Sequence, residues 1–433
     1  MTPIFRSLLG LLLFALVTPT LRAQLTLEAC YQLAEQHYPL VRQTDLLRQT
    51  EALTLDNIAR AWRPQVVASA QATVQSDVAQ WPENLTAMMQ GVGMTAPQGI
   101  ARDQYKFAVQ IDQLLYDGGA TRQQKAVAQA ETAVAQSGVA VELYALRQRV
   151  AQLFFGLLLI DQQLDNHRVL QSVLADNHRK ALAQQRGGVA PGQVVTLLEA
   201  EQITAQQGEL ALQSQRRALQ RLLATFLGRD TAALGTLVCP PERSLALDEN
   251  HRPELRQFDA RAALLHQRET QLATALRPRI SAFAQGWYGY PGLNLFHDMQ
   301  SRAWSLNGIV GVRAVWDLSR LYTYRNDRTR LALERQSVDV ARQTFLLNQQ
   351  LQSTQQQEEV ARWRSLQATD DQLVALRQQA RQNTERAVTL GTADANALVQ
   401  DIAREHQART DRTTHQLQLL QAIYQLRNTH NHE

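Results

Sequence analysis

Apolar and polar residues alternate in several short segments of the chain. In the first half the alternation covers residues 66–74, where Val and Ala exchange mainly with Gln, Ser and Thr, and residues 105–111. In the second half it covers residues 306–314 and, less regularly, residues 280–290. A period of two is typical of a strand with two chemically different faces. The sequence therefore predicts four amphipathic strands.

Two much longer stretches favour helices. Residues 321–390 contain no glycine and no proline, and at about 1.5 Å per residue they predict a helix of roughly 105 Å. Residues 120–186 predict a second long helix, interrupted only by Gly138 and Gly156. Within it, apolar residues step by four and three positions, the spacing of a coiled-coil seam. They are Leu146, Val150, Leu153, Leu157, Ile160 and Leu164.

Residues at the ends of these stretches favour helix boundaries. Asp117 and Asp317 precede the long helices and are expected to act as N-caps. The long helices are expected to end at glycine, because glycine accepts the left-handed conformation that follows a helix. The glycines concerned are Gly187, Gly188 and Gly391.

Three shorter helices complete the pattern. Pro191 suits the first turn of a helix that we expect to run to Leu227, and another is expected from Asp394 to Arg427. A third, of about 35 residues, is expected ahead of the first strand. Two such helices stacked end to end match one long helix in length, which predicts that they meet at mid-height.

The chain also contains an internal duplication. Four short motifs recur in the same order: residues 37–43 at 251–257, 63–66 at 277–280, 115–117 at 315–317 and 188–190 at 391–393. We therefore expect a first structural repeat at 24–228, a linker at 229–250, a second repeat at 251–429 and a short tail at 430–433.

The N-terminus has the three parts of a secretory signal peptide. Arg6 precedes an apolar run from Leu8 to Val17, and a stretch with small residues ends at Ala23. We expect residues 1–23 to be removed and the rest of the chain to be exported.

Charge and composition exclude several classes of protein. Loss of Arg6 and Arg22 leaves 42 basic against 40 acidic residues, so the net charge falls from +4 to +2, which argues against a nucleic-acid partner. The longest apolar run beyond the signal, Leu153 to Ile160, is far shorter than the ~20 residues of a membrane helix, so none is expected. The sequence has no metal-ligand pattern, phosphate-binding loop or nucleophile elbow, so we expect no enzyme, no cofactor and no metal.

The two cysteines have two possible roles in an exported chain. Cys30 and Cys239 could form a disulfide, because both are expected near mid-height. The sequence Leu27-Glu28-Ala29-Cys30 has the outline of a lipoprotein box, but Glu28 disfavours lipidation.

Four strands are too few for a closed membrane barrel, since such barrels begin at about eight strands and cannot leave an open edge in lipid. The strands therefore form either a soluble sheet or part of a barrel shared between chains. The long helices favour sharing, because a rod of this length needs lateral partners along its seam.

In these features the chain resembles the TolC-type outer-membrane efflux protein family over essentially its whole mature length. The motifs that carry the resemblance are Leu25-Thr26-Leu27-Glu28-Ala29, Leu115-Tyr116-Asp117-Gly118-Gly119, Gly188-Val189-Ala190, Leu197-Leu198-Glu199-Ala200-Glu201 and Gly391-Thr392-Ala393. The resemblance implies a mainly α fold with a small β part, in which the long helices form an α-barrel and each chain contributes four strands to a shared transmembrane β-barrel. It implies a homotrimer in the outer membrane of a Gram-negative bacterium, with most of the chain in the periplasm. The implied partners are a periplasmic adaptor, an inner-membrane pump and outer-membrane lipid.

The resemblance also assigns roles to the two helix tips. Residues expected to contact the adaptor are Gly187, Gly188, Val189, Ala190, Pro191, Gly391, Thr392 and Ala393. Candidates for the periplasmic aperture are Gln193, Asp394, Asn396 and Asp401. This chain departs from the family where an acidic residue usually follows the tip glycine by about six positions, since Val194 or Gln193 and Ala397 stand there. Asp394 could alternatively only favour the start of its helix.

Three aromatic residues are candidates for a girdle at the lipid boundary: Trp287, Tyr288 and Tyr290. They could instead pack under the loop around Pro291. Two rival functions remain: a periplasmic coiled-coil adaptor or other secreted interaction protein, and a basic nucleic-acid binder. An adaptor would not need four matched amphipathic strands.

Overall fold

The computed structural model describes four stretches of the chain, residues 24–95, 99–188, 192–244 and 250–431. The expected signal peptide, residues 1–23, lies outside them. The chain divides into two compact units, and each draws on both halves of the sequence. The helical unit comprises residues up to Thr44, Gly138–Arg256 and residues from Arg342 onward, and the sheet unit comprises Asp45–Ser137 and Gln257–Ala341.

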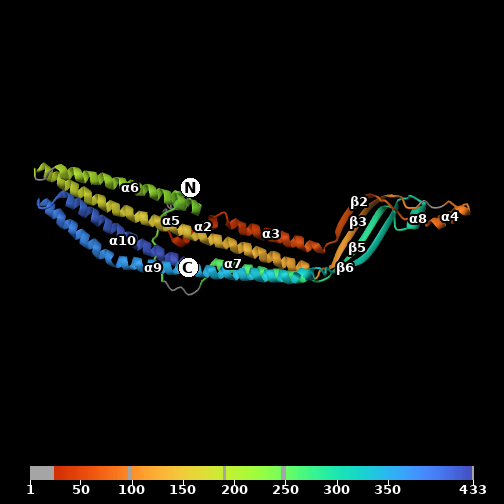
Figure 1. Cartoon of the computed structure of the whole chain (residues 1–433). Coiled ribbons are helices and arrows are strands. Elements are labelled where there is room, and N and C mark those ends of the chain that lie inside the picture. The colour runs from red at the N-terminus through yellow and green to blue at the C-terminus, as the bar shows by residue number, and fades with distance from the viewer. Residues whose placement is uncertain (1–23, 96–98, 189–191, 245–249, 432–433) are drawn as a thin grey trace, which may run out of the picture. The chain divides into compact units, whose positions relative to one another are not determined.

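The sheet unit is built on one antiparallel sheet of four strands, which confirms the four predicted strands. They are β2 (Gln65–Val74), β3 (Asp103–Tyr116), β5 (Arg279–Tyr290) and β6 (Ser305–Val315), in the order β2-β3-β5-β6. In the loops between paired strands lie two short helices, α4 (Glu83–Gly91) and α8 (Leu295–Gln300), near one end of the sheet (Figure 1). Strands β2 and β6 are the edges, so each has one side with no strand partner among the described residues of this chain.

The long and half-length helices also follow the prediction closely. The two long helices are α5 (Ala120–Arg186) and α9 (Arg320–Thr389), and part of each belongs to each unit. In the helical unit, α6 (Gly192–Leu227) returns beside α5 and α10 (Ala395–His430) returns beside α9 (Figure 1). The two halves of the chain thus form helical hairpins of the same design.

The opening of the chain differs from the prediction of one 35-residue helix. It forms two helices, α2 (Leu27–His37) and α3 (Val41–Ala59), and the second repeat opens with α7 (Pro253–Thr274). The break falls at Pro39, because proline lacks the amide that a helix needs and disfavours helical geometry in the residue before it. The sequence also did not indicate β1 (Gln24–Leu25), which pairs in parallel with β4 (Thr236–Leu237) in the linker.

The core of the helical unit contains the predicted seam. Phe154 and Phe155 are almost fully buried, and around them pack apolar residues of α2, α6 and α10. Of the six seam residues, all but Leu153 are buried, so the coiled-coil spacing identified a packed face. Within the described residues, α5 is the one helix that is long and apolar enough to cross a membrane. The short apolar runs of the sequence predicted no such helix. Half of its most apolar stretch is buried within the protein.

Candidate functional site: sheet wall and helix tips

The four-stranded sheet has one apolar and one polar face. Strand register places successive residues on opposite faces, so that Phe107 lies level with Ala70 and Tyr288, and Lys106 with Gln71 and Gly289. The apolar face carries Val66, Ala68, Ala70, Ala72, Val74, Tyr105, Phe107, Val109, Ile111, Ala282, Ala284, Tyr288, Leu306, Val310 and Val312. The polar face carries Gln65, Ser69, Gln71, Thr73, Gln104, Lys106, Gln110, Asp112, Arg279, Ser281, Gln285, Ser305, Asn307 and Arg313, with Val67, Phe283, Trp287 and Ile309 among them.

Along the inner strand β3 the pattern of exposure is the reverse of that in a soluble protein. Along β3 the apolar residues at odd positions are exposed, whereas the polar-face residues between them are half-buried or buried. Phe107 is 56% exposed, while its neighbour Ala108, on the polar face, is 5% exposed. The same apolar exposure continues on the two edge strands, with Val66 and Val310. On the edge strands β2 and β6 most residues of both faces are exposed, so the polar face is shielded chiefly along β3. There the sheet presents its apolar side outward.

Aromatic residues gather on the apolar face at the end near α4 and α8. The ring of Trp304 has its centroid 5.4 Å from that of Tyr288, 5.8 Å from Tyr105 and 5.9 Å from Phe107. At the opposite end of the sheet, Trp62, Tyr116 and Trp316 are all exposed. The sheet therefore has an aromatic group near each end.

The three residues predicted for the girdle do not share one environment. Tyr288 is exposed on the apolar face, in the group around Trp304. Trp287 is buried on the polar face, where the ammonium of Lys106 lies 4.5 Å from its ring centroid. Tyr290 is buried, and its hydroxyl donates to the Asp298 carbonyl at 3.0 Å and accepts from the amide of Ala101 at 3.0 Å. Packing under the loop, the alternative interpretation, describes Tyr290.

An aspartate precedes each long helix by three residues and accepts hydrogen bonds from backbone amides near the start of the helix. The Asp117 carboxylate accepts from Gly119 N at 2.8 Å and from Thr121 N at 2.7 Å. Burial of Asp117 opposes its ionisation, but these hydrogen bonds outweigh burial and lower the pKa of the carboxyl below its usual value. At Asp317 a hydrogen bond from Ser319 chiefly lowers the carboxyl pKa. Asp117 thus binds an amide of the first turn of α5, as predicted, whereas Asp317 binds the amide of Ser319, just ahead of α9.

At the first helix tip, α5 ends at Arg186 and the chain turns through Gly187 and Gly188, the latter with φ +74°. Residues Val189, Ala190 and Pro191 lie outside the described residues. Gln193, a candidate for the aperture, is exposed in the first turn of α6.

At the second tip, Gly391 has φ +73°, and Thr392 donates its amide to the Ala387 carbonyl at 2.9 Å. Ala393 is half-buried just before α10. The predicted glycine turns are therefore present at both tips.

The remaining aperture candidates have distinct surroundings. Asp394 is the N-cap residue of α10 and is exposed, and it accepts a hydrogen bond from Asn396 at 3.0 Å. Asp401 lies further along the same helix, where it accepts from the Thr384 hydroxyl at 2.7 Å and pairs with Arg404 at 3.2 Å. The Asp401 carboxylate thus ties α10 to α9.

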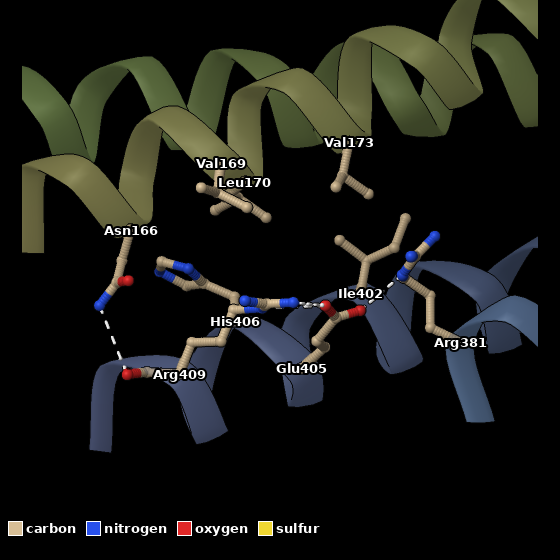
Figure 2. Close-up of a pocket in the computed structure, with 9 residues that line it drawn as sticks. All are labelled: Asn166, Val169, Leu170, Val173, Arg381, Ile402, Glu405, His406 and Arg409. Carbon is tan, nitrogen blue, oxygen red and sulfur yellow. Dashed lines mark hydrogen bonds and ion pairs between the residues drawn. The ribbon is translucent and has the colours of Figure 1, made fainter. Parts of the chain in front are cut away.

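A buried ion network, which the sequence analysis did not identify, joins the helices behind the tips (Figure 2). The Glu405 side chain is 6% exposed, and its carboxylate lies 2.5 Å from Arg381 Nε and 2.8 Å from Arg409 Nη2. Arg381 also pairs with Glu385 at 2.9 Å, and Glu385 pairs with Lys180 of α5. The network therefore connects α5, α9 and α10. The cavity among these residues is ≈ 10 Å³, which makes it a packed joint and not a ligand site.

Two histidines lie beside this network. The rings of His167 on α5 and His406 on α10 meet edge to face, with centroids 4.9 Å apart. Burial, and then the neighbouring His167, lower the pKa of His406 to about 4. His406 is therefore neutral at physiological pH.

The expected disulfide is absent from the structure, because Cys30 and Cys239 are both free thiols. Cys30 is fully buried in the core beneath α5, whereas Cys239 is exposed in the linker. Both cysteines were expected near the middle of the long helices, but their thiols are not bonded. Burial raises the pKa of Cys30 to about 12, so its thiol is protonated and unreactive.

Exposed apolar residues on several helices follow a seven-residue spacing. On α9 these are Leu333, Val340 and Leu347. The same spacing relates Leu46 to Leu53 on α3 and Ile203 to Leu210 on α6. A seven-residue spacing is the period of a coiled-coil seam, and in the single chain these residues are exposed.

Comparison with solved structures identifies the fold. The outer-membrane channel OprN matches 94% of this chain and 90% of its own length, with a TM-score of 0.68 and 15% identity. The outer membrane protein VceC from Vibrio cholerae matches 92% and 95%, with a TM-score of 0.61 and 14% identity. The MtrE outer membrane channel of Neisseria gonorrhoeae, solved in an open state, matches 94% and 89%, with a TM-score of 0.63 and 12% identity. No protein-family model and no characterised protein sequence matches the chain.

These channels share the TolC-type fold, and the chain described here has it too: mainly α, with long paired helices and a small β part. The predicted fold class is confirmed.

Proposed function

We propose that the chain is one subunit of a homotrimeric exit duct in the outer membrane of a Gram-negative bacterium, and that it belongs to the TolC-type efflux family. In this proposal an inner-membrane pump, in a tripartite efflux or type I secretion system, supplies the energy and a periplasmic adaptor connects pump and duct. The duct conducts substrates passively and catalyses no reaction.

The observation that carries the proposal is the inverted exposure along β3, with exposed apolar residues on the same face of the edge strands. An exposed apolar face opposite a shielded polar face suits a wall between lipid and water. Tyr105 and Tyr116 are eleven residues apart along β3, and a bulge between Leu114 and Tyr116 places both on the apolar face, near its two ends. At about 3.3 Å per residue and a tilt of ~40°, they are separated by ~28 Å across the membrane, near the ~25 Å height of the apolar band in such barrels. Tyr288 and Trp304 then belong to the outer aromatic girdle.

Two open edges and the exposed helical rows support self-association. Four strands cannot close a barrel, but three copies would supply twelve, with β6 of one copy beside β2 of the next. The rows that include Leu333, Val340 and Leu347 would then pack against neighbouring subunits in an α-barrel.

The helix tips are the proposed contact with the adaptor, through Gly187–Pro191 and Gly391–Ala393. Gln193, Asp394, Asn396 and Asp401 are proposed to surround the periplasmic aperture. The buried network around Glu405 supports this assignment, because it joins both hairpins of one chain just behind the tips.

A periplasmic adaptor remains the second candidate, since it too would have long helices and an export signal. The exposed apolar face of the sheet disfavours it, because a soluble adaptor would hold that face in water.

Fractionation and cross-linking test the proposal. The mature chain should be found in the outer-membrane fraction, extract only with detergent, and cross-link to a species of three chains. A monomer that is soluble without detergent would contradict the proposal.

A charge placed in the exposed row of α9 tests the helical part of the assembly. Val340→Glu should leave the helices folded but weaken the cross-linked species, because the carboxylate would have to be buried against a neighbouring subunit. Gln352→Glu is the control, since it adds the same charge at an exposed position of α9 that lies outside the row. Equal yields of the cross-linked species from both variants would show that the row is not a subunit interface.

A further inference from the structure

The polar face of the sheet carries an excess of positive charge. Across the four strands its ionised side chains are Lys106, Arg279 and Arg313 against one acid, Asp112. The other polar side chains on that face are neutral, and most are glutamine or serine. The charge is therefore set by these four residues.

Two of the cations are held by aromatic rings of the same face. The Lys106 ammonium lies 4.5 Å from the ring centroid of Trp287, and the Arg313 guanidinium lies 4.8 Å from that of Phe283. An aromatic ring orients a cation without neutralising it. This gives a role to the two large aromatic residues on this largely polar face.

The single acid is directed toward a neutral partner. Asp112 accepts a hydrogen bond from the Gln110 amide at 2.6 Å, and Lys106 lies 3.5 Å from the amide oxygen of Gln285. Arg279 lies at the end of the sheet in a groove that already contains other acids and arginines, among them Asp317 and Arg320, so we expect its own contribution to be the smallest. Lys106 and Arg313 alone still outnumber Asp112.

We propose that the β-barrel part of the duct is electropositive and passes anionic solutes in preference to cations. This inference rests on the proposed function, because only in a closed barrel does the polar face line a pore. Three copies would bring at least six cations against three acids into one lumen. Charges of one sign along a narrow low-dielectric wall raise the local concentration of counter-ions. Solutes with carboxylate, sulfonate or phosphate groups are expected to pass most readily.

The experiment is the permeability ratio of chloride to potassium, from reversal potentials of the purified trimer in planar bilayers under a KCl gradient. The wild-type ratio should exceed 1. Lys106→Gln and Arg313→Gln together should lower it by about twofold or more, because both ring-held cations are lost. Gln71→Lys, which adds a cation to the same face, should raise it. Arg279→Gln should change it least.

The outcomes separate the two proposals. If no ion-conducting pore forms, the exit duct itself is refuted, and the charge preference with it. A pore with a ratio of 1 or less overturns the anion preference and leaves the duct standing. A ratio that neither Gln71→Lys nor the paired substitutions move also overturns it, because selectivity would then lie outside the sheet. Trimer yield from the outer membrane checks that each variant assembles.

Discussion

The buried network behind the tips permits a quantitative prediction for Glu405→Gln. This change keeps the size of the side chain and removes its charge, which leaves Arg381 and Arg409 without their shared carboxylate. Breaking a buried ion pair costs about 3–5 kcal/mol. Arg381 retains Glu385, and the Arg409 side chain is 29% exposed, so the cost here should be smaller. We expect the joint between α9 and α10 to lose about 2–3 kcal/mol.

Amide hydrogen exchange of the assembled protein measures this loss locally. A loss of about 2–3 kcal/mol corresponds to roughly 30- to 150-fold faster exchange, here in the segment 395–409. Glu199→Gln on α6 is the control, because the Glu199 side chain is 56% exposed and its contact with His178 is weakly stabilising. Unchanged exchange in Glu405→Gln would show that the network does not hold the hairpin, and that the argument from burial is wrong. Faster exchange with a larger pore conductance would connect the network to the aperture.

Three further changes test other parts of the fold. The pKa of His406 is lowered from 6.5 to about 4, so the unfolded state binds this proton first as pH falls. The free energy of unfolding should therefore drop between those pH values by on the order of 1–2 kcal/mol, with the partial exposure of the ring taken into account. Unfolding midpoints at pH 7 and pH 5 measure the drop, and His406→Gln should reduce the dependence of the midpoint on pH. Asp117→Ala should destabilise the start of α5 by about 1 kcal/mol, seen as a lower Tm. Gly118→Ala, with φ +70° and a new Cβ 2.7 Å from that of Arg277, should lower the Tm more than Gly188→Ala, where φ is +74° but nothing lies within 4 Å. Equal effects of the two glycine substitutions would contradict the steric argument.

The local signals in the sequence predicted most of the fold. Absence of glycine and proline identified α9, and the glycine turns identified where both long helices end, because these depend on backbone conformation. Pro39 also predicts the break between α2 and α3, since proline cannot continue a helix. The expectation of a single helix of about 35 residues does not take this proline into account.

The site was less predictable. Trp287 and Tyr288 are consecutive in a strand, so they must lie on opposite faces, and the period of two could have excluded one from the girdle. Trp304 stands outside the alternating segment, and no local signal joined it to Tyr288. The partners of Glu405 include a residue of another helix, so its burial depends on tertiary packing. For the same reason sequence could not decide whether Cys30 and Cys239 meet.

The two unpartnered strand edges have a consequence for handling this protein. In a single chain in water, the edges of β2 and β6 can pair with any extended peptide, and the neighbouring apolar face promotes aggregation. If association completes the sheet, as proposed above, the stability of the folded state will depend on chain concentration and on detergent. If the proposed duct is correct, newly made chains expose these edges until they assemble, so overproduction should raise aggregation unless something covers the edges.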